Sequence, residues 1–142
     1  MPEGAGLWPA FRLLSGYRTG PAPDIDIAML SGDAPGTLHH GHSYGTSDGR
    51  VKFEDTTTGA GGQSFADGFH DYGVEWRRGM IKWYVDGEVV ATLEDENVAG
   101  QLLYIEANLG VGGDLVGSTD PTAFPATLQI DYIKAWQRKD IH

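Results

Sequence analysis

Turn-forming residues interrupt this sequence at intervals of roughly ten residues, and that spacing limits the fold more than any other feature. The chain has 21 Gly and 7 Pro among its 142 residues, which favours many short elements over long helices. No window shows a clear 3.6-residue period of apolar side chains. The sequence therefore predicts an all-β fold, either a sandwich or a barrel.

Alternating apolar and polar side chains mark the predicted strands between these turns. The strongest short-range signal is Asp86-Gly87, because this pair favours a two-residue hairpin turn whose twist matches that of the flanking strands. Residues 127–136 show the clearest alternation, which predicts a strand with one apolar face. Strands are predicted over residues 7–14, 24–30, 37–44, 69–76, 80–85, 88–93, 101–109 and 127–136.

Size, charge and composition exclude several classes of protein. Residues 1–142 suffice for a single domain, and a content of 40% hydrophobic and 11% aromatic residues argues against disorder. The net charge of −10 repels a nucleic-acid backbone and an anionic membrane surface, so we expect no nucleic-acid partner. No apolar run approaches the roughly 20 residues that span a bilayer. Because there are no Cys residues, disulfides, thiolate metal sites and thiol nucleophiles are excluded.

Two aspartates are the least expected residues in a predicted strand. Asp is depleted in strands, yet Asp24 and Asp26 occur two positions apart. This spacing places both carboxylates on one face, roughly 6–7 Å apart, with Ile25 and Ile27 on the other face. Two like charges at this distance repel, so a function or a partner must hold them. From the residues alone, a functional site and a pair satisfied by Arg or backbone donors both remain open.

Several sequence blocks, which together cover nearly the whole chain, share their order and spacing with one known family. The blocks are Gly-Leu-Trp-Pro-Ala-Phe-Arg-Leu-Leu at 6–14, Asp-Ile-Asp-Ile-Ala-Met at 24–29, Phe-His-Asp-Tyr-Gly-Val-Glu-Trp at 69–76, Trp-Tyr-Val-Asp-Gly at 83–87, Asn-Leu-Gly-Val-Gly-Gly at 108–113, Phe-Pro-Ala at 124–126 and Ile-Asp-Tyr-Ile at 130–133. Through these blocks the chain resembles the family 16 glycoside hydrolases, the laminarinase and lichenase type of β-glucanase. The resemblance implies a concanavalin A-like β-sandwich (a jelly roll), a polysaccharide partner and an extracellular or periplasmic location.

The same resemblance implies a catalytic strand that is degenerate here. It places a nucleophile at Asp24, a supporting carboxylate at Asp26 and the acid/base at Ala28 or Met29, depending on whether the strand carries a bulge. The family has Glu at the first and last of these positions; Asp24 is one methylene shorter, and neither Ala28 nor Met29 can donate a proton. General acid–base assistance is worth about 10²–10⁴-fold, and a misplacement of about 1 Å can cost about 10²-fold. We therefore expect hydrolysis to be lost or strongly impaired.

The resemblance also implies a substrate cleft. Its expected lining is Trp8, Arg12, His40, His42 and Asn108. A structural role is the alternative for Trp8. Arg12 and Leu115 stand where the family has sugar-stacking Trp residues, so the ligand is expected to be altered or bound more weakly. A guanidinium at Arg12 would suit an anionic sugar.

Histidines and acidic residues raise the question of metals. In a strand, His40 and His42 face the same way. This arrangement suits either chelation of a metal ion or a place in the cleft wall. We favour the cleft, where one of the two histidines could replace the missing acid. The resemblance implies a possible calcium ligand at Asp131, to which Asp114 and Asp120 could add oxygen atoms. No cofactor is otherwise required.

Family members are longer, so residues 1–142 are expected to match the C-terminal part of their domain. A sheet without its usual neighbours exposes strand edges and apolar faces, and we expect a second copy or another chain to cover them. The leading hypothesis is carbohydrate binding with lost or impaired hydrolysis. The alternatives are an active endo-β-1,3(4)-glucanase that uses Asp24 and Asp26, and a non-catalytic structural or assembly subunit.

Overall fold

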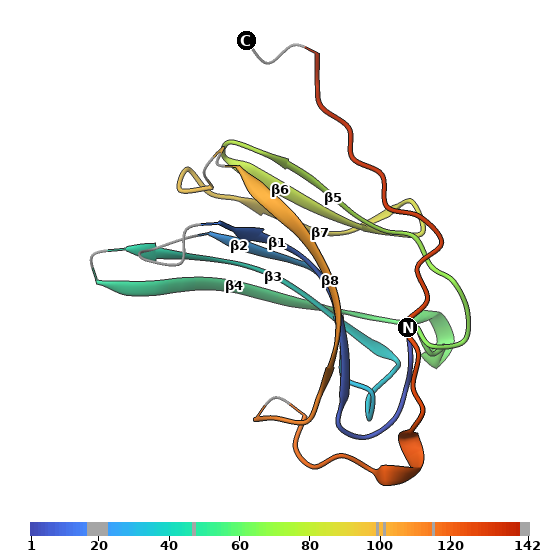
Figure 1. Ribbon diagram of the computed structural model, residues 1–142. Coiled ribbons are helices and arrows are strands. Elements are labelled where there is room, and N and C mark those ends of the chain that lie inside the picture. The colour runs from blue at the N-terminus through green and yellow to red at the C-terminus, as the bar shows by residue number, and fades with distance from the viewer. Residues whose placement is uncertain (17–22, 47, 99, 101, 115, 140–142) are drawn as a thin grey trace.

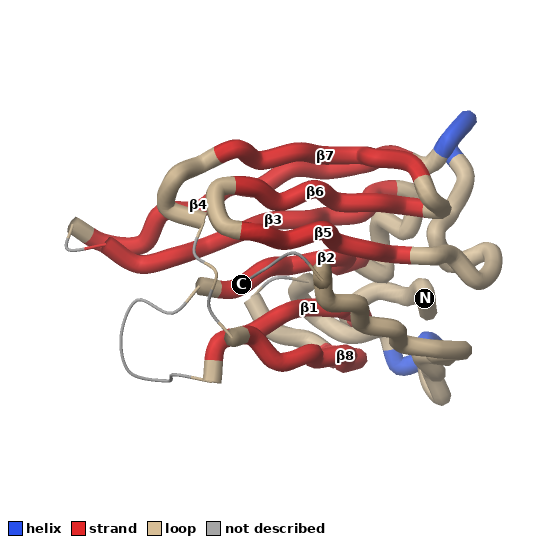
Figure 2. Tube along the Cα trace, turned by 90° about the horizontal axis from the view of Figure 1, so that it is seen from above, coloured by secondary structure: helices blue, strands red, loops and turns tan. Residues whose placement is uncertain are grey.

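A computed structural model describes residues 1–16, 23–46, 48–98, 100, 102–114 and 116–139. Over these ranges the chain forms two antiparallel sheets, and Figures 1 and 2 show the smaller sheet lying over one face of the larger. The strands are β1 (Leu7–Ser15), β2 (Asp24–Leu30), β3 (Thr37–Thr46), β4 (Gly49–Thr58), β5 (Tyr72–Arg77), β6 (Met80–Val85), β7 (Glu88–Glu94) and β8 (Leu103–Val111), with short 3-10 helices at η1 (Ala60–Gly62) and η2 (Pro121–Ala123). The prediction of an all-β sandwich is confirmed.

The order of strands in each sheet decides which faces are covered. The larger sheet has the order β4-β3-β2-β1-β8 and the smaller has the order β5-β6-β7. In the contacts between sheets, β5 lies against β2 and β7 against β4. The β8 side of the larger sheet is less covered, and Ile105 and Val111 are 43% and 54% exposed there.

The core lies between the two sheets. Ile25, Ile81 and Trp83 are completely buried in it, and the Trp83 ring stacks on Phe53 with centroids 5.4 Å apart. Burial of one such side chain stabilises the fold by about 1.5–3 kcal/mol. The alternation of β2 therefore has a simple cause: its isoleucines face the smaller sheet, and its aspartates face away from it.

One strand, β4, was not predicted from the sequence. β4 pairs with β3 from Thr37↔Thr58 to Thr46↔Gly49, although no strand was predicted between residues 44 and 69. Most β4 side chains are exposed, and Phe53 is the one that packs against the core. With so little apolar alternation, β4 owes its strand structure to the hydrogen bonds that β3 offers rather than to its own pattern.

The strand predicted at residues 127–136 is wrong. The segment is extended, but among the described residues it pairs with no strand, and Figure 1 shows it running past the ends of both sheets. Ile130, Tyr132 and Trp136 are 52%, 50% and 84% exposed, so the apolar face predicted for this segment is not buried. The alternation states which face would be apolar, but a strand also needs a neighbour to satisfy its N–H and C=O groups.

Three expectations are not tested by this fold. The single domain over residues 1–142, the extracellular or periplasmic location and the covering of exposed apolar faces by a second copy stay predictions; light scattering during size-exclusion chromatography would test the last of them. In the part of the chain that the structure describes, no helix is long and apolar enough to cross a membrane.

Candidate functional site

A β-bulge in β2 decides which residues reach the open face of the larger sheet. Between the pairs Asp26↔Gly41 and Met29↔His39, β2 has one residue more than β3, and the register with β1 shifts in the same way. The extra residue turns both Ile27 and Ala28 toward the core, where they are 4% and 0% exposed. Met29 therefore shares the open face with Asp24 and Asp26, and Ala28 does not.

Each of the two aspartates is bound to an arginine. Arg12 Nε donates to Asp26 Oδ1, and Arg50 Nη2 donates to Asp24 Oδ2 at 2.7 Å. Arg50 is also held by Ser43 Oγ, which accepts from its Nε at 3.1 Å. The repulsion expected between the two carboxylates is thus relieved by one arginine each, one from β1 and one from β4.

Core side chains hold the backbone beneath the same two residues. His42 Nδ1 donates to the Asp24 carbonyl oxygen at 2.9 Å, and Trp83 Nε1 donates to the Asp26 carbonyl oxygen at 2.9 Å. Both donors are buried, at 3% and 0% exposure. The open face of β2 is therefore fixed from its core side as well as by the arginines.

The two histidines expected in the cleft are almost completely buried. His40 and His42 are 2% and 3% exposed, and His40 Nε2 is 2.8 Å from Thr57 Oγ1. Burial lowers the pKa of both imidazoles, and nearby Asp55 partly opposes the shift at His40. The alternation of β3 gives the open face to His39, Gly41 and Ser43, although His42 and His40 each border one part of the groove described below. The replacement of the missing acid by one of them stays a prediction.

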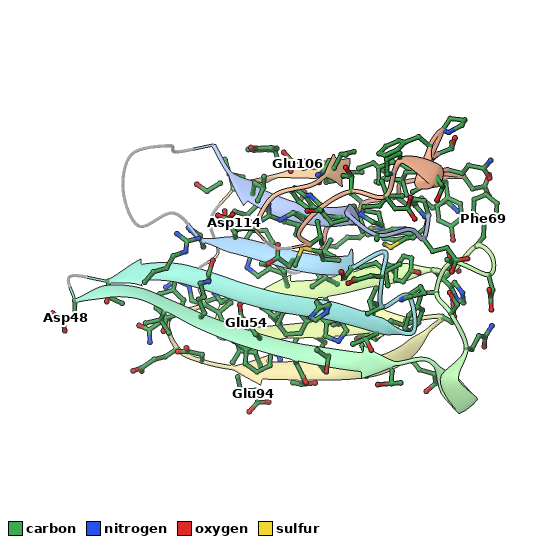
Figure 3. All side chains as sticks on the ribbon, turned by 90° about the horizontal axis from the view of Figure 1, so that it is seen from below. Asp48, Glu54, Phe69, Glu94, Glu106 and Asp114 are labelled. Carbon is green, nitrogen blue, oxygen red and sulfur yellow. The ribbon has the colours of Figure 1, made fainter. Side chains whose placement is uncertain are left out.

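The open face carries a groove with two adjoining parts, and Figure 3 looks onto this face. We call the smaller part, of about 190 Å³, the charged half, and the larger part, of about 470 Å³, the Trp8 half. Asp26 and Glu54 border both halves. The charged half also includes Arg12, Asp24, His42, Ser43, Arg50 and Lys52, and the Trp8 half includes Trp8, Met29, His39, His40, Thr56 and Val116.

Trp8 forms a fixed aromatic surface in its half of the groove. Its indole lies against Gly110, where a Cβ atom would be only 1.9 Å from Trp8 Cε2, so the packing requires glycine there. Trp8 Nε1 donates to the Gly112 carbonyl oxygen at 3.1 Å. Asn108 lies on the same face opposite Ala10 but borders neither half, and its buried Oδ1 has no hydrogen-bond partner among the described residues.

Several groove residues were missed by the sequence reasoning. Glu54 was missed because β4 was not predicted; it lies opposite Gly41, and Figure 3 labels it on the open face. A Cβ atom at Gly41 would be 3.8 Å from both Asp26 Oδ2 and Glu54 Cγ, so the glycine leaves the space between these two carboxyl groups free. His39 was passed over for its neighbours, although the alternation of β3 sets it apart from His40 and His42.

The calcium expectation finds no support in the arrangement of ligands. Asp131 lies exposed in the extended segment after η2, and within the described ranges no three His, Cys, Asp or Glu residues come together as a possible metal site. Calcium takes six to eight oxygen ligands, so the residues present do not fit it. Leu115 lies outside the described residues.

Comparison with known proteins decides the family. Residues 1–134 match the model of the glycosyl hydrolases family 16. The chain belongs to this family. Its resemblance to glucanases, noted from the sequence blocks, is thereby confirmed, and the solved relatives confirm the jelly-roll fold.

The curated relatives include glucan-degrading enzymes much longer than this chain. Glucan endo-1,3-beta-glucosidase A1 of Niallia circulans is 32% identical over 98% of this chain and 23% of its own length. Endo-1,3-1,4-beta-glycanase EglC of Rhizobium meliloti is 33% identical over 96% of this chain and 28% of its own length. This family 16 chain thus spans about a quarter of the length of these two relatives.

A solved relative shows the same relation in three dimensions. The endo-beta-1,3-glucanase from Pyrococcus furiosus superposes with a TM-score of 0.75 at 32% identity. The match covers 89% of this chain and 53% of that protein. The two sheets of this chain therefore correspond to about half of a family 16 glucanase.

Proposed function

We propose that this family 16 chain binds β-glucan along the groove of its larger sheet and hydrolyses it weakly or not at all. The observation that carries the proposal is the identity of the residue that follows Asp24 and Asp26 on the open face of β2. The resemblance places the proton donor there, and the bulge puts Met29 there instead. A thioether neither gives nor takes a proton at the glycosidic oxygen.

The state of the carboxylates supports impaired catalysis. Oδ2 of Asp24 accepts a hydrogen bond from Arg50 at 2.7 Å, and a charge-assisted bond of this kind makes the carboxylate a weaker nucleophile. It also reaches about one methylene less far than the Glu of the family. The missing acid and the shortened nucleophile together remove ~10⁴–10⁶ of the rate.

The Trp8 half supports binding of a sugar chain. Sugar rings present flat C–H faces that pack on aromatic surfaces, and Trp8 is held in place for such packing by Gly110 and Gly112. The carboxylates of Asp26 and Glu54, at the junction of the two halves, are acceptors for sugar hydroxyl groups. An apolar surface with a few polar groups is the usual composition of a ligand site.

Calorimetric titration with laminarin and lichenan, beside a reducing-sugar assay at high protein load, tests the proposal. We expect saturable binding with little or no turnover. Protein that binds neither glucan contradicts the proposal and favours the structural or assembly subunit.

The runner-up function is a working endo-β-1,3(4)-glucanase that uses Asp24 as nucleophile and Asp26 as its support. The names of the two curated relatives favour it, since one is an endo-1,3-beta-glucosidase of glucan and the other an endo-1,3-1,4-beta-glycanase. Rapid turnover by the wild-type chain that Asp24→Asn abolishes would establish this function. Binding without rapid turnover would establish the leading proposal.

A further inference from the structure

The position that lacks a proton donor has an imidazole beside it. The bulge turns Met29 onto the open face, and its partner across the strand pair in β3 is His39. Side chains at directly opposed positions of antiparallel strands share a face, with Cβ atoms roughly 4.5–5.5 Å apart. The His39 ring therefore stands next to the side chain that replaced the family's acid.

His39 is also accessible from the groove. It is half-buried, and it borders the Trp8 half together with Met29 and Asp26. His40 and His42 are only 2% and 3% exposed, so His39 is the most exposed of the three β3 histidines that border the groove. The groups that border the groove around it are mostly acidic. These charged and titratable groups are Asp26 on β2, Glu54 and Asp55 on β4, Arg12 on β1 and His40 on β3.

We infer that His39 is the proton donor for the slow glucan hydrolysis that the groove retains, an inference that rests on the proposed glucan-binding function. The imidazolium gives its proton to the glycosidic oxygen while the bond from this oxygen to the anomeric carbon breaks, and the bonding electron pair stays on the oxygen. The Asp24 carboxylate forms an ester bond to the anomeric carbon. Water then attacks this carbon, the neutral His39 ring takes the proton of that water, and the carboxylate leaves.

Glu54 is the competing donor, and its position is less favourable. It lies opposite Gly41, so it faces Asp26 rather than Met29. Its carboxylate is also paired with Lys52, whose Nζ lies 3.9 Å from Oε1.

Three variants separate the two donors by laminarin turnover at high protein load. His39→Asn is expected to lower turnover by about 10²-fold, and Glu54→Gln by less than about threefold. Glu94→Gln, on β7 of the other sheet, is the matched control and should leave turnover unchanged. Laminarin affinity and the melting temperature of each variant show whether the groove itself is intact.

A pH profile and a rescue variant distinguish a proton donor from a merely structural histidine. Wild-type turnover should fall on the alkaline side through a titration that is missing in His39→Asn. Adding Met29→Glu to His39→Asn should restore turnover, because it returns a carboxyl group to β2. The restored profile should fall at lower pH than that of the wild type, because a carboxyl group loses its proton at lower pH than an imidazole.

Several results would overturn the inference. Wild-type protein that binds laminarin but gives no turnover above the protein-free blank removes the donor role and leaves the proposed binding function standing. Loss of turnover in Glu54→Gln, with His39→Asn unaffected, assigns the role to Glu54. If wild-type protein shows neither binding nor turnover, the proposed function fails along with the inference.

Discussion

The two halves of the groove lie on the same strands, yet they have opposite properties. In the charged half, Asp24 is paired with Arg50, and Asp26 at its border is paired with Arg12. In the Trp8 half, the Trp8 indole, the His39 imidazole and the uncharged Met29 border the groove beside Asp26 and Glu54. The comparison teaches that one face of a sheet can present aromatic and apolar side chains in one half while ion pairs hold its aspartates in the other.

Restoring the family's two Glu residues on β2 is expected to change the activity of the groove more than any other substitution. In Asp24→Glu with Met29→Glu, we expect laminarin hydrolysis to rise by about 10²–10⁴-fold over the wild type, because a proton donor and a longer nucleophile return together. A reducing-sugar assay measures the rise, and Met29→Leu serves as control. If the double variant stays as slow as the wild type, the absent acid is not what limits the chain.

Removal of the indole tests the binding half. Trp8→Ala is expected to weaken laminarin binding by roughly tenfold, about 1.4 kcal/mol, because the flat surface for sugar packing is lost. Calorimetric titration measures the change. The matched control is Trp136→Ala, since Trp136 is 84% exposed and lies away from the groove. Equal losses in both variants would show that Trp8 has no special part in binding.

The buried histidine beneath the charged half predicts how stability depends on pH. Burial lowers the pKa of His42 in the fold, so above about 6.5, the usual value for an unfolded histidine, both states are neutral and stability is complete. As pH falls below that value, the unfolded chain takes up the proton first and stability declines until the folded pKa is passed. Urea unfolding should therefore give a lower free energy at pH 5.5 than at pH 7.5.

The variant His42→Asn sharpens this test. Its amide can still donate to the Asp24 carbonyl oxygen in place of Nδ1, but it does not titrate. We expect the difference in unfolding free energy between the two pH values to become smaller. An unchanged difference would assign the pH dependence to other groups.

Loss of one arginine should have the smallest effect. Arg50 is 41% exposed in its pair with Asp24, and exposed ion pairs are worth only about 0–1 kcal/mol. We expect Arg50→Gln to lower the free energy of unfolding by no more than that, with laminarin affinity almost unchanged. Arg77→Gln on β5, whose Nε is 4.0 Å from Glu75, is the matched control. A loss of binding as large as that of Trp8→Ala would place the ligand in the charged half.

Local pattern predicted the elements that bring their own apolar face. β2 was predicted with its observed bounds, and the hairpin at Asp86-Gly87 joins β6 and β7 as expected. The polar strand β4 could not be predicted from local pattern, and its groove residues Arg50 and Glu54 were therefore missed as well. The segment at 127–136 shows the converse, since a strong pattern without a neighbour forms no strand.

By itself, the sequence determined an all-β chain of family 16 and the common face of Asp24 and Asp26, because alternation is a property of neighbouring residues. Only the tertiary structure decided that Met29 rather than Ala28 shares that face, and that His39 rather than His40 or His42 stands beside it. The physical reason is that a bulge and a cross-strand register arise where distant segments pair, and a shift of one residue exchanges the buried and the open side of a strand.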